Sequence, residues 1–230
     1  MAVAAMLVVL GLIFALAMLP QMWIKRTIDR HSADRPDFPD TGGEFARRVL
    51  DAMQLTNVKV QESGLSDHYD PDSKTIGLTQ RHFRGRSLAA VVIAAHEAGH
   101  AMQDAAGYPP LQARTRLAKQ ALRMEKLAAV MMLAAPAVMV LAKAPQLVLV
   151  EVFIGVMIFA LSILVHAVTL PVEIDASFRR ALPLLKAGRY IGDKDLDSAR
   201  QILKAAALTY VCAAAMSALD VARWFRLLRL

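Results

Sequence analysis

AVVIAAHEAGHAMQ, residues 90–103, is an apolar stretch that carries three ionisable side chains in its middle. His96 and His100 are four residues apart, so on a helix both imidazoles lie on one face, about one turn from each other. Two imidazoles placed in this way can reach a single metal ion. Glu97 projects in a neighbouring direction, where it can hold water rather than the metal. The stretch therefore has the HExxH pattern of a zinc site, with two ligands and a general base.

The surroundings of this pattern favour a metal site over a chance match. Three apolar residues, Val91 to Ile93, precede it, and Gly107 with the pair Pro109-Pro110 follows. These signals predict one buried helix from Arg86 to about Ala106. A buried helix has little reason to carry three ionisable groups unless they are paired or coordinated.

A catalytic zinc ion usually has three protein ligands and one open position, so a third ligand is needed. No His stands at the spacing that the extended HExxHxxGxxH pattern needs, and Gln103 occupies the position seven residues after His96. We expect Glu173, in LPVEIDAS (170–177), to be the third ligand, because a long apolar run leads back to it. Asp175 is the rival ligand, although it points elsewhere on a helix. Asp175 or Ser177 is instead expected to orient a ligand imidazole.

Composition narrows the class of protein. Of the 230 residues, 56% are hydrophobic, above the 45–50% that is usual for soluble domains. The single Cys, Cys212, excludes an internal disulfide framework and a thiolate metal cluster. The net charge of +7 could suit nucleic acid, but the aromatic and glycine-rich patterns of RNA-binding modules are missing. Basic flanks of a membrane protein explain the charge more simply, and no nucleic-acid partner is expected.

Long apolar runs predict membrane spans. The two middle runs are joined by KAPQ alone, so we expect them to form an antiparallel hairpin. Sixteen of the 27 Lys and Arg residues lie in 21–126 and seven in 171–204, which predicts that both segments are cytoplasmic. The chain is thus expected in the inner membrane, multi-pass, with its active site facing the cytoplasm. The runs are 3–19, 127–142, 147–170 and 205–222.

The predicted fold is mainly α: an integral membrane helical bundle of three to four spans, with a small α+β zincin-like domain between the first two. In that domain Asp70-Pro71-Asp72-Ser73 fits a type I turn between two short strands. His31, His68 and His82 have no partner at metal spacing and are interpreted as surface residues. The predicted organisation is a membrane anchor in 1–24, the catalytic domain in 25–126, a transmembrane hairpin in 127–170, the third-ligand segment in 171–204, and a membrane helix with a basic tail in 205–230.

Several blocks in order resemble one protein family. DHYDP (67–71), HEAGH (96–100), the two-run hairpin and LPVEIDAS occur in sequence. The chain resembles the YugP-like neutral zinc metallopeptidases of bacterial membranes over nearly its whole length. The resemblance implies a gluzincin-type membrane endopeptidase that binds one catalytic Zn²⁺ through His96, His100 and Glu173, with Glu97 as base.

A more distant likeness links the chain to heat-shock membrane proteases and CAAX prenyl endopeptidases. Those enzymes have Asp four residues after the ligand Glu, whereas this chain has Ser177. The likeness implies that the strand at 74–79, with Ile76, Gly77 and Leu78, pairs with an extended substrate. The residue that stabilises the oxyanion is not identified by pattern, and side-chain chemistry alone leaves three candidates: Arg179, Arg180 and Tyr190.

These observations favour a zinc-dependent endopeptidase that cuts membrane proteins or peptides at the bilayer. Zn²⁺ would make water acidic, and Glu97 would take its proton during attack on a peptide carbonyl. The alternative is a non-catalytic zinc-binding adaptor or chaperone-like partner, although a structural site normally has four protein ligands. A metal transporter would need more ionisable residues inside the spans. An oligomer or a regulatory partner is compatible with the sequence.

Overall fold

The computed structural model describes residues 18–142 and 147–209, and its central element is α4 (Leu88–Ala105). Ser87 caps the helix by accepting a hydrogen bond from Ala90 N at 3.1 Å. Most side chains of α4 are buried, as expected of a helix that is apolar on every face. The helix predicted around HEAGH is confirmed, and it packs against α2, α3, the sheet and the chain beyond α6.

A three-stranded sheet lies beside α4. Its strands, in the order β1-β3-β2, are β1 (Lys59–Ser63), β3 (Thr75–Thr79) and β2 (His68–Asp70). β1 runs parallel to β3, whereas β2 runs antiparallel to it with His68 opposite Gly77. Asp70 closes the hairpin by accepting from Asp72 N at 3.0 Å and Ser73 Oγ at 2.6 Å. The hairpin predicted around Asp70-Pro71 is therefore confirmed.

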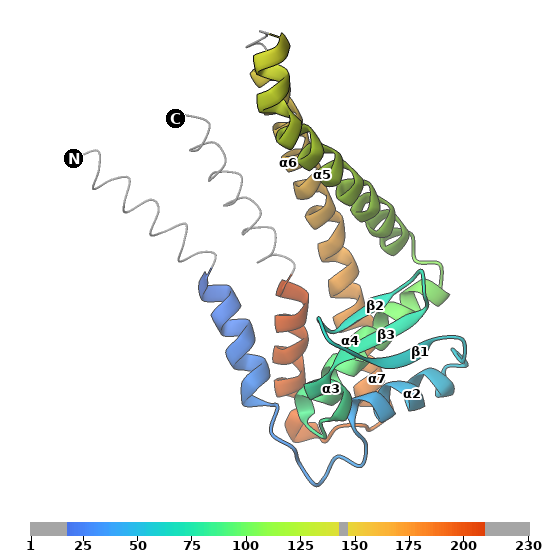
Figure 1. Cartoon of the computed structure of the whole chain (residues 1–230). Helices are drawn as coiled ribbons and strands as arrows, with labels where there is room; N and C mark the ends of the chain where they lie inside the picture. Colours follow the sequence, from blue (N-terminus) through green and yellow to red (C-terminus); the bar gives the residue numbers. More distant parts are fainter. Residues whose placement is uncertain (1–17, 143–146, 210–230) are drawn as a thin grey trace, which may run out of the picture.

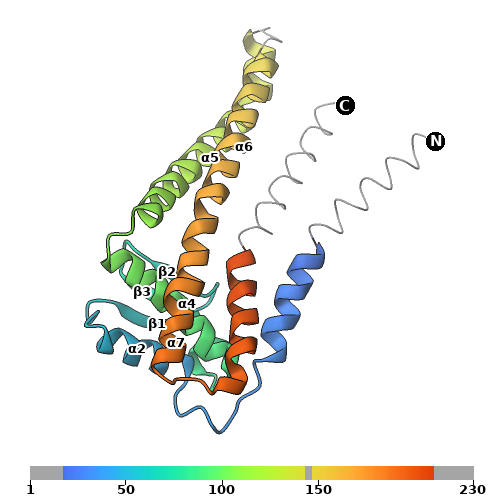
Figure 2. The ribbon, with the colours of Figure 1, turned by 180° about the vertical axis from the view of Figure 1, so that it is seen from behind.

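Helices surround this centre. α2 begins with a capping box in which Thr41 and Glu44 satisfy each other's backbone N–H groups. Residues 18–30 and 196–209 are also helical, and these two helices lie side by side, with Ile24 against Ala205 (Figures 1 and 2). The remaining helices are α2 (Gly42–Ala52), α3 (Gln80–Arg84), α5 (Pro109–Ala142), α6 (Leu147–Ile174), the π-helical η1 (Asp175–Ala181), α7 (Leu182–Ala187) and the short η2 (Asp193–Asp195).

α5 and α6 pack together as a hairpin that extends away from the sheet (Figure 1). α6 then returns to the centre and continues directly into η1, which packs against α4. Figure 2 shows the same return of α6 from behind. The hairpin thus carries the LPVEIDAS segment back to the HEAGH helix.

The integral membrane helical bundle predicted from the sequence is wrong for the described part of the chain. Among residues 18–142 and 147–209, no helix combines the length and the apolar character needed to cross a bilayer. The run at 127–142 continues a helix whose first half carries Arg114, Lys119 and Arg123, so the apolar run was not a separate element. Most of run 3–19, the KAPQ turn and most of run 205–222 lie outside the described residues.

Candidate functional site

Three buried side chains from two distant segments meet inside the protein. His96 and His100 come from α4, and Glu173 comes from the last turn of α6. His96 Nε2 lies 3.1 Å from Glu173 Oε2, and His100 Nε2 lies 3.3 Å from the same oxygen. One ligand atom from each of the three lies within 4.8 Å of the others. The fold therefore brings together the three residues that the sequence predicted as ligands.

The approach of α4 to η1 makes this meeting possible. At Gly99, between the two imidazoles, a Cβ would lie 2.7 Å from the carbonyl oxygen of Ala176. A side chain of any size would push the two helices apart. η1 itself is a π-helical turn placed directly after the ligand residue, and such turns are frequent at functional sites.

The donor set fits a zinc ion. Zinc binds imidazole nitrogen and carboxylate oxygen at about 2.0–2.2 Å in tetrahedral geometry, so neighbouring donor atoms lie roughly 3.3 Å apart. The distances of 3.1 and 3.3 Å between the imidazole nitrogens and Glu173 Oε2 are close to this spacing. Glu173 Oε1 is buried without a hydrogen-bond partner among the described residues. A bound cation would compensate the negative charge of this buried carboxylate, which is costly to remove from water.

The two glutamates of the site, Glu97 and Glu173, have pKa values shifted in opposite directions. Burial by itself raises the pKa of Glu173, but the charges and hydrogen bonds of His100 and His96 hold it well below its usual range. Burial raises the pKa of Glu97 to about 7, and the nearby Glu173 adds to the rise while His96 opposes it. Glu173 is therefore held as an anion, as a ligand must be, whereas Glu97 can both accept and release a proton near neutral pH.

Each imidazole is also held at its second nitrogen. Ser177 Oγ lies 3.0 Å from His96 Nδ1, as the sequence predicted for a residue that orients an imidazole. Gln103 Oε1 lies 2.9 Å from His100 Nδ1. Asp175, the rival ligand, is not part of the cluster, and its carboxylate accepts hydrogen bonds from Gln103 and Arg180.

The cluster opens onto a cavity of about 530 Å³. Glu97 and Arg114 line the cavity beside the three buried ligand candidates, and so does the segment Leu65–Tyr69 that leads into β2. Ile28, Ala206 and Thr209, from the two terminal helices of the described chain, form another part of its wall. The cavity therefore lies between the β2 segment and these helices, with Glu97 on its wall.

The three candidates for oxyanion stabilisation lie elsewhere. Arg179, Arg180 and Tyr190 are not among the described residues that line the cavity. Arg180 pairs with Asp175, and the Tyr190 ring packs edge-on against Phe45 at 5.1 Å. Side-chain chemistry alone could not place them, because η1 turns both arginines away from the cluster.

Sequence reasoning missed two polar residues of the cavity. Arg114, near the start of α5, has its Nη1 atom 3.6 Å from Glu173 Oε1. Its signal was its position four residues after the Pro pair, where the chain leaves the HEAGH helix. His68 lies on β2 and lines the same cavity. His68 belongs to the DHYDP block, but it has no partner at the spacing of a metal site, so no pattern in the sequence placed it at the cavity.

The predicted substrate edge is wrong, because β3 is the central strand. Ile76 pairs with β1 on one side and with β2 on the other, and Gly77 does the same. Leu78 is fully buried in the core. Gly77 serves a different purpose, since a Cβ there would lie 2.6 Å from the ring of His68. The edge strand next to the cavity is β2.

His82 is buried rather than exposed, which corrects its interpretation as a surface residue. Its Nδ1 donates to Asp67 Oδ2 at 2.7 Å. Asp67 also accepts from Thr79 N at 2.7 Å, so it connects the segment before β2 to the start of α3. Burial tends to raise the pKa of Asp67, but His82 and Thr79 lower it below its usual value overall.

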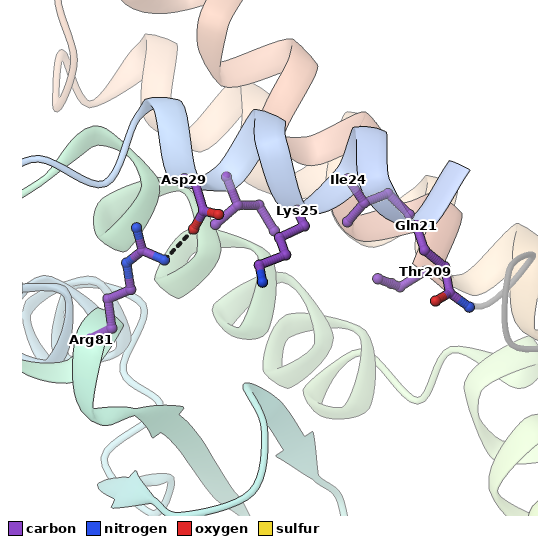
Figure 3. A pocket seen from close by; sticks show the side chains of 7 residues that line it. Gln21, Ile24, Lys25, Asp29, Arg81 and Thr209 are labelled. Carbon is purple, nitrogen blue, oxygen red and sulfur yellow. Dashed lines mark hydrogen bonds and ion pairs between the residues drawn. The ribbon is translucent and has the colours of Figure 1, made fainter. Parts of the chain in front are cut away.

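A second cavity adjoins the first. It has a volume of about 480 Å³ and shares Ile28 and Thr209 with the cavity that holds the metal cluster. Figure 3 shows Lys25 and Asp29 of the helix 18–30 facing this space, with Asp29 paired to Arg81. The helix 18–30 therefore lines both cavities.

Comparison with known proteins places this site in a known context. Residues 6–229 match a family model described as "Putative neutral zinc metallopeptidase". The chain is 31% identical over 206 residues to "Putative membrane protease YugP" of Bacillus subtilis (strain 168), covering 89% of this chain and 88% of that protein. No solved structure matches the chain. Zinc is the metal of the matched family, and His96, His100 and Glu173 form the group that could hold it.

Proposed function

Because the chain belongs to the neutral zinc metallopeptidase family, we propose that it is a zinc-dependent endopeptidase that hydrolyses peptide bonds of proteins or peptides. The observation that carries this proposal is the meeting of His96, His100 and Glu173 at one point, with Glu97 on the same cavity wall. Two imidazoles and one carboxylate are three ligands, which leaves a position open for the reaction.

The chain's own residues supply the acid–base chemistry. A zinc ion bound by His96, His100 and Glu173 provides Lewis acidity, which polarises a carbonyl and makes water more acidic. Glu97 accepts a proton from the attacking water as the C–O bond forms. It then passes that proton to the leaving amine as the C–N bond breaks, so no net proton is gained or lost. The pKa of Glu97, raised to about 7 by burial, supports both transfers.

The substrate is proposed to bind as an added strand along β2. β2 is an edge strand, because among the described residues it pairs with β3 alone, and the segment leading into it lines the cavity. An edge strand presents unpaired N–H and C=O groups to an extended peptide. Arg114 lies on the same cavity, where its positive charge can stabilise the anion that develops on the scissile carbonyl.

The substrates are proposed to be proteins or peptides of the cytoplasmic membrane, cut on its cytoplasmic side. The relative in Bacillus subtilis is named a membrane protease. Large apolar side chains on α5 and α6 are exposed, among them Leu127 at 57% and Phe153 at 64%. Such a surface supports contact with an apolar environment.

Replacement of Glu97 by Gln separates catalysis from metal binding. The purified Glu97→Gln variant is expected to keep its zinc but to lose about 10²–10⁴-fold in kcat, because the amide cannot accept the proton. His96→Ala is expected to lose the zinc itself. Glu62→Gln, which changes an exposed carboxylate paired with Arg84, is the matched control and should cleave as the wild type does.

Two outcomes would contradict the proposal. Full cleavage by Glu97→Gln would remove the mechanism, and zinc binding without any cleavage by the wild-type protein would favour a non-catalytic adaptor. The same inactive variant, expressed in its native membranes, should retain uncleaved substrates. Captured proteins that are uniformly free of membrane association would overturn the proposed substrate class.

A further inference from the structure

Gln103 is completely buried on α4, three residues beyond His100. Its Oε1 atom lies 2.9 Å from Nδ1 of that imidazole. A fully buried amide has to satisfy its donors and its acceptor inside the protein. The partners at its other end therefore decide what Gln103 can offer to His100.

Those partners all accept hydrogen bonds. Gln103 Nε2 donates to the carbonyl oxygen of Val172 at 2.8 Å and to Asp175 Oδ2 at 2.9 Å. Arg180 Nε also donates to Asp175 Oδ2, at 2.8 Å, and this guanidinium keeps the carboxylate an acceptor. If the amide were turned over, its oxygen would face two other oxygens. A single orientation remains, with Nε2 toward Asp175 and Oε1 toward His100.

This orientation sets the proton position on His100. An amide oxygen can only accept, so the hydrogen of a neutral imidazole must be on Nδ1. In this neutral form the lone pair is on Nε2, the atom that lies 3.3 Å from Glu173 Oε2, and it becomes available to a metal once the proton that Nε2 shares with Glu173 has left. We propose that Gln103 is a positioning residue that holds His100 in its metal-binding tautomer, and that Asp175 and Arg180 act through Gln103 by fixing its amide.

The other imidazole is held in a less specific way. Ser177 Oγ lies 3.0 Å from His96 Nδ1 and donates to the carbonyl oxygen of Leu203 at 3.3 Å. While its single O–H points to Leu203, Ser177 Oγ accepts from His96 Nδ1, but the hydroxyl can also rotate and donate to Nδ1, so Ser177 does not by itself fix the tautomer of His96. Control of the tautomer is therefore assigned to Gln103 alone, and Ser177→Ala should weaken zinc binding less than Gln103→Leu.

The test measures the zinc dissociation constant by competition with a chromophoric chelator. Gln103→Leu should weaken zinc binding about 10–100-fold, the usual cost of losing a group that orients a ligand. Gln112→Leu is the matched control, because this exposed amide reaches only the carbonyl oxygen of Gly107 at 3.5 Å. Its zinc affinity should equal that of the wild type. Wild-type affinity in a folded Gln103→Leu variant overturns the inference.

A swap of hydrogen-bonding polarity distinguishes positioning from mere packing. In Gln103→Glu the new carboxylate faces Asp175, and zinc binding should weaken. Adding Asp175→Asn supplies an amide donor to that carboxylate, although the carbonyl oxygen of Val172 still faces it and Arg180 loses an acceptor, so the rescue should be partial. The double variant should recover at least threefold of the lost affinity. Failure to recover, with both variants folded, overturns the proposed relay.

Nitrogen NMR of the zinc-free wild-type protein gives a readout that requires no variant. At alkaline pH, where the imidazoles are neutral, the spectrum should show His100 protonated at Nδ1. Protonation at Nε2 would overturn the inference even if every variant failed to fold. The inference rests on the proposed zinc site, but the two can fail separately. A wild-type protein that binds no zinc removes the proposed function, whereas an unaffected Gln103→Leu removes only the role of Gln103.

Discussion

Gly99 determines how closely the two ligand-bearing segments can approach. The helix α4 has a glycine in its interior, where glycine costs about 1 kcal/mol relative to alanine. The close approach of the Ala176 carbonyl explains this residue, because a Cβ would lie 2.7 Å from its oxygen. The glycine of the HEAGH pattern therefore has a steric role rather than a chemical one.

Gly99→Ala is expected to weaken both the fold and the metal site. The new methyl group must displace η1, which carries Ser177 and follows Glu173 directly. Overpacking of this kind costs about 1–3 kcal/mol, measurable by urea unfolding, and zinc affinity should fall with it. Gly155→Ala on α6 is the matched control, since a Cβ there meets no atom within 4 Å. Equal stability and equal zinc affinity in the two variants would contradict this account.

At the scale of single residues, the sequence predicted what depends on local spacing. His96, Glu97 and His100 follow from helical periodicity. The sequence assigned no role to Gln103, because that role depends on Asp175 from a segment 72 residues away. His82 looked like a surface residue because Asp67, its partner, belongs to a different element.

At the scale of elements, β2 is the strand along which we propose that the substrate binds. A peptide added antiparallel to an edge strand bonds through alternate residues, because the N–H groups of the others point away. Methylation of single backbone nitrogens in a non-cleavable peptide should therefore raise its inhibition constant at every second position, by about tenfold. The positions in between are the internal control. A uniform effect along the peptide would show that β2 is not the docking edge.

Asp67 fixes the approach to β2 in a pH-dependent way. Its pKa is lower in the folded protein than in the unfolded chain, because His82 and Thr79 outweigh burial. Its contribution is therefore present above the unfolded value and is lost as the pH falls below about 4. Asp67→Asn should lose about 1–3 kcal/mol of unfolding free energy at neutral pH.

This loss should shrink at acidic pH, as urea unfolding at several pH values would show. The control is Asp72→Asn, which removes an exposed carboxylate paired with Lys119. A deficit of Asp67→Asn that stays constant between neutral and strongly acidic pH would contradict the proposed linkage.

Turn chemistry predicted the β2–β3 hairpin and the HEAGH helix, because both are local. The parallel pairing of β1 with β3 has no such local signal, because β2 lies between the two strands in the sequence although not in the sheet. Their order placed β3 in the centre, which excluded the predicted substrate edge. The π-helical η1 was equally hidden, since its wide turn depends on packing against α4.

At the scale of the whole molecule, a bound metal should join the α5–α6 hairpin to the centre of the fold. Zinc that binds the folded protein alone stabilises it by about 4 kcal/mol when its free concentration is 1,000 times the Kd. For a chain of this size, chelation should lower Tm by roughly 10 °C. His96→Ala should melt at the same temperature with and without chelator. An unchanged Tm of the wild-type protein would contradict a metal shared between α4 and α6.

The apolar runs correctly predicted that α6 returns toward α4, although the membrane bundle predicted from the same runs is wrong for the described residues. The short KAPQ connection predicted antiparallel packing of two apolar runs, and α5 and α6 do pack together. The predicted integral membrane bundle failed because α5 and its basic first half form one continuous helix in the described chain. The meeting of Glu173 with the imidazoles depends on the α5–α6 hairpin, which returns the chain to α4.

Glu173 follows His96 by 77 positions in the sequence, so the two residues are synthesised at different times. A ribosome that has made the HEAGH helix has not yet made the carboxylate, nor the cavity wall at Ala206 and Thr209. The nascent protein therefore carries its proton-transfer group long before it can hold the ion that this group requires. The order of synthesis alone therefore leaves the proposed zinc site incomplete until most of the polypeptide has left the ribosomal exit tunnel.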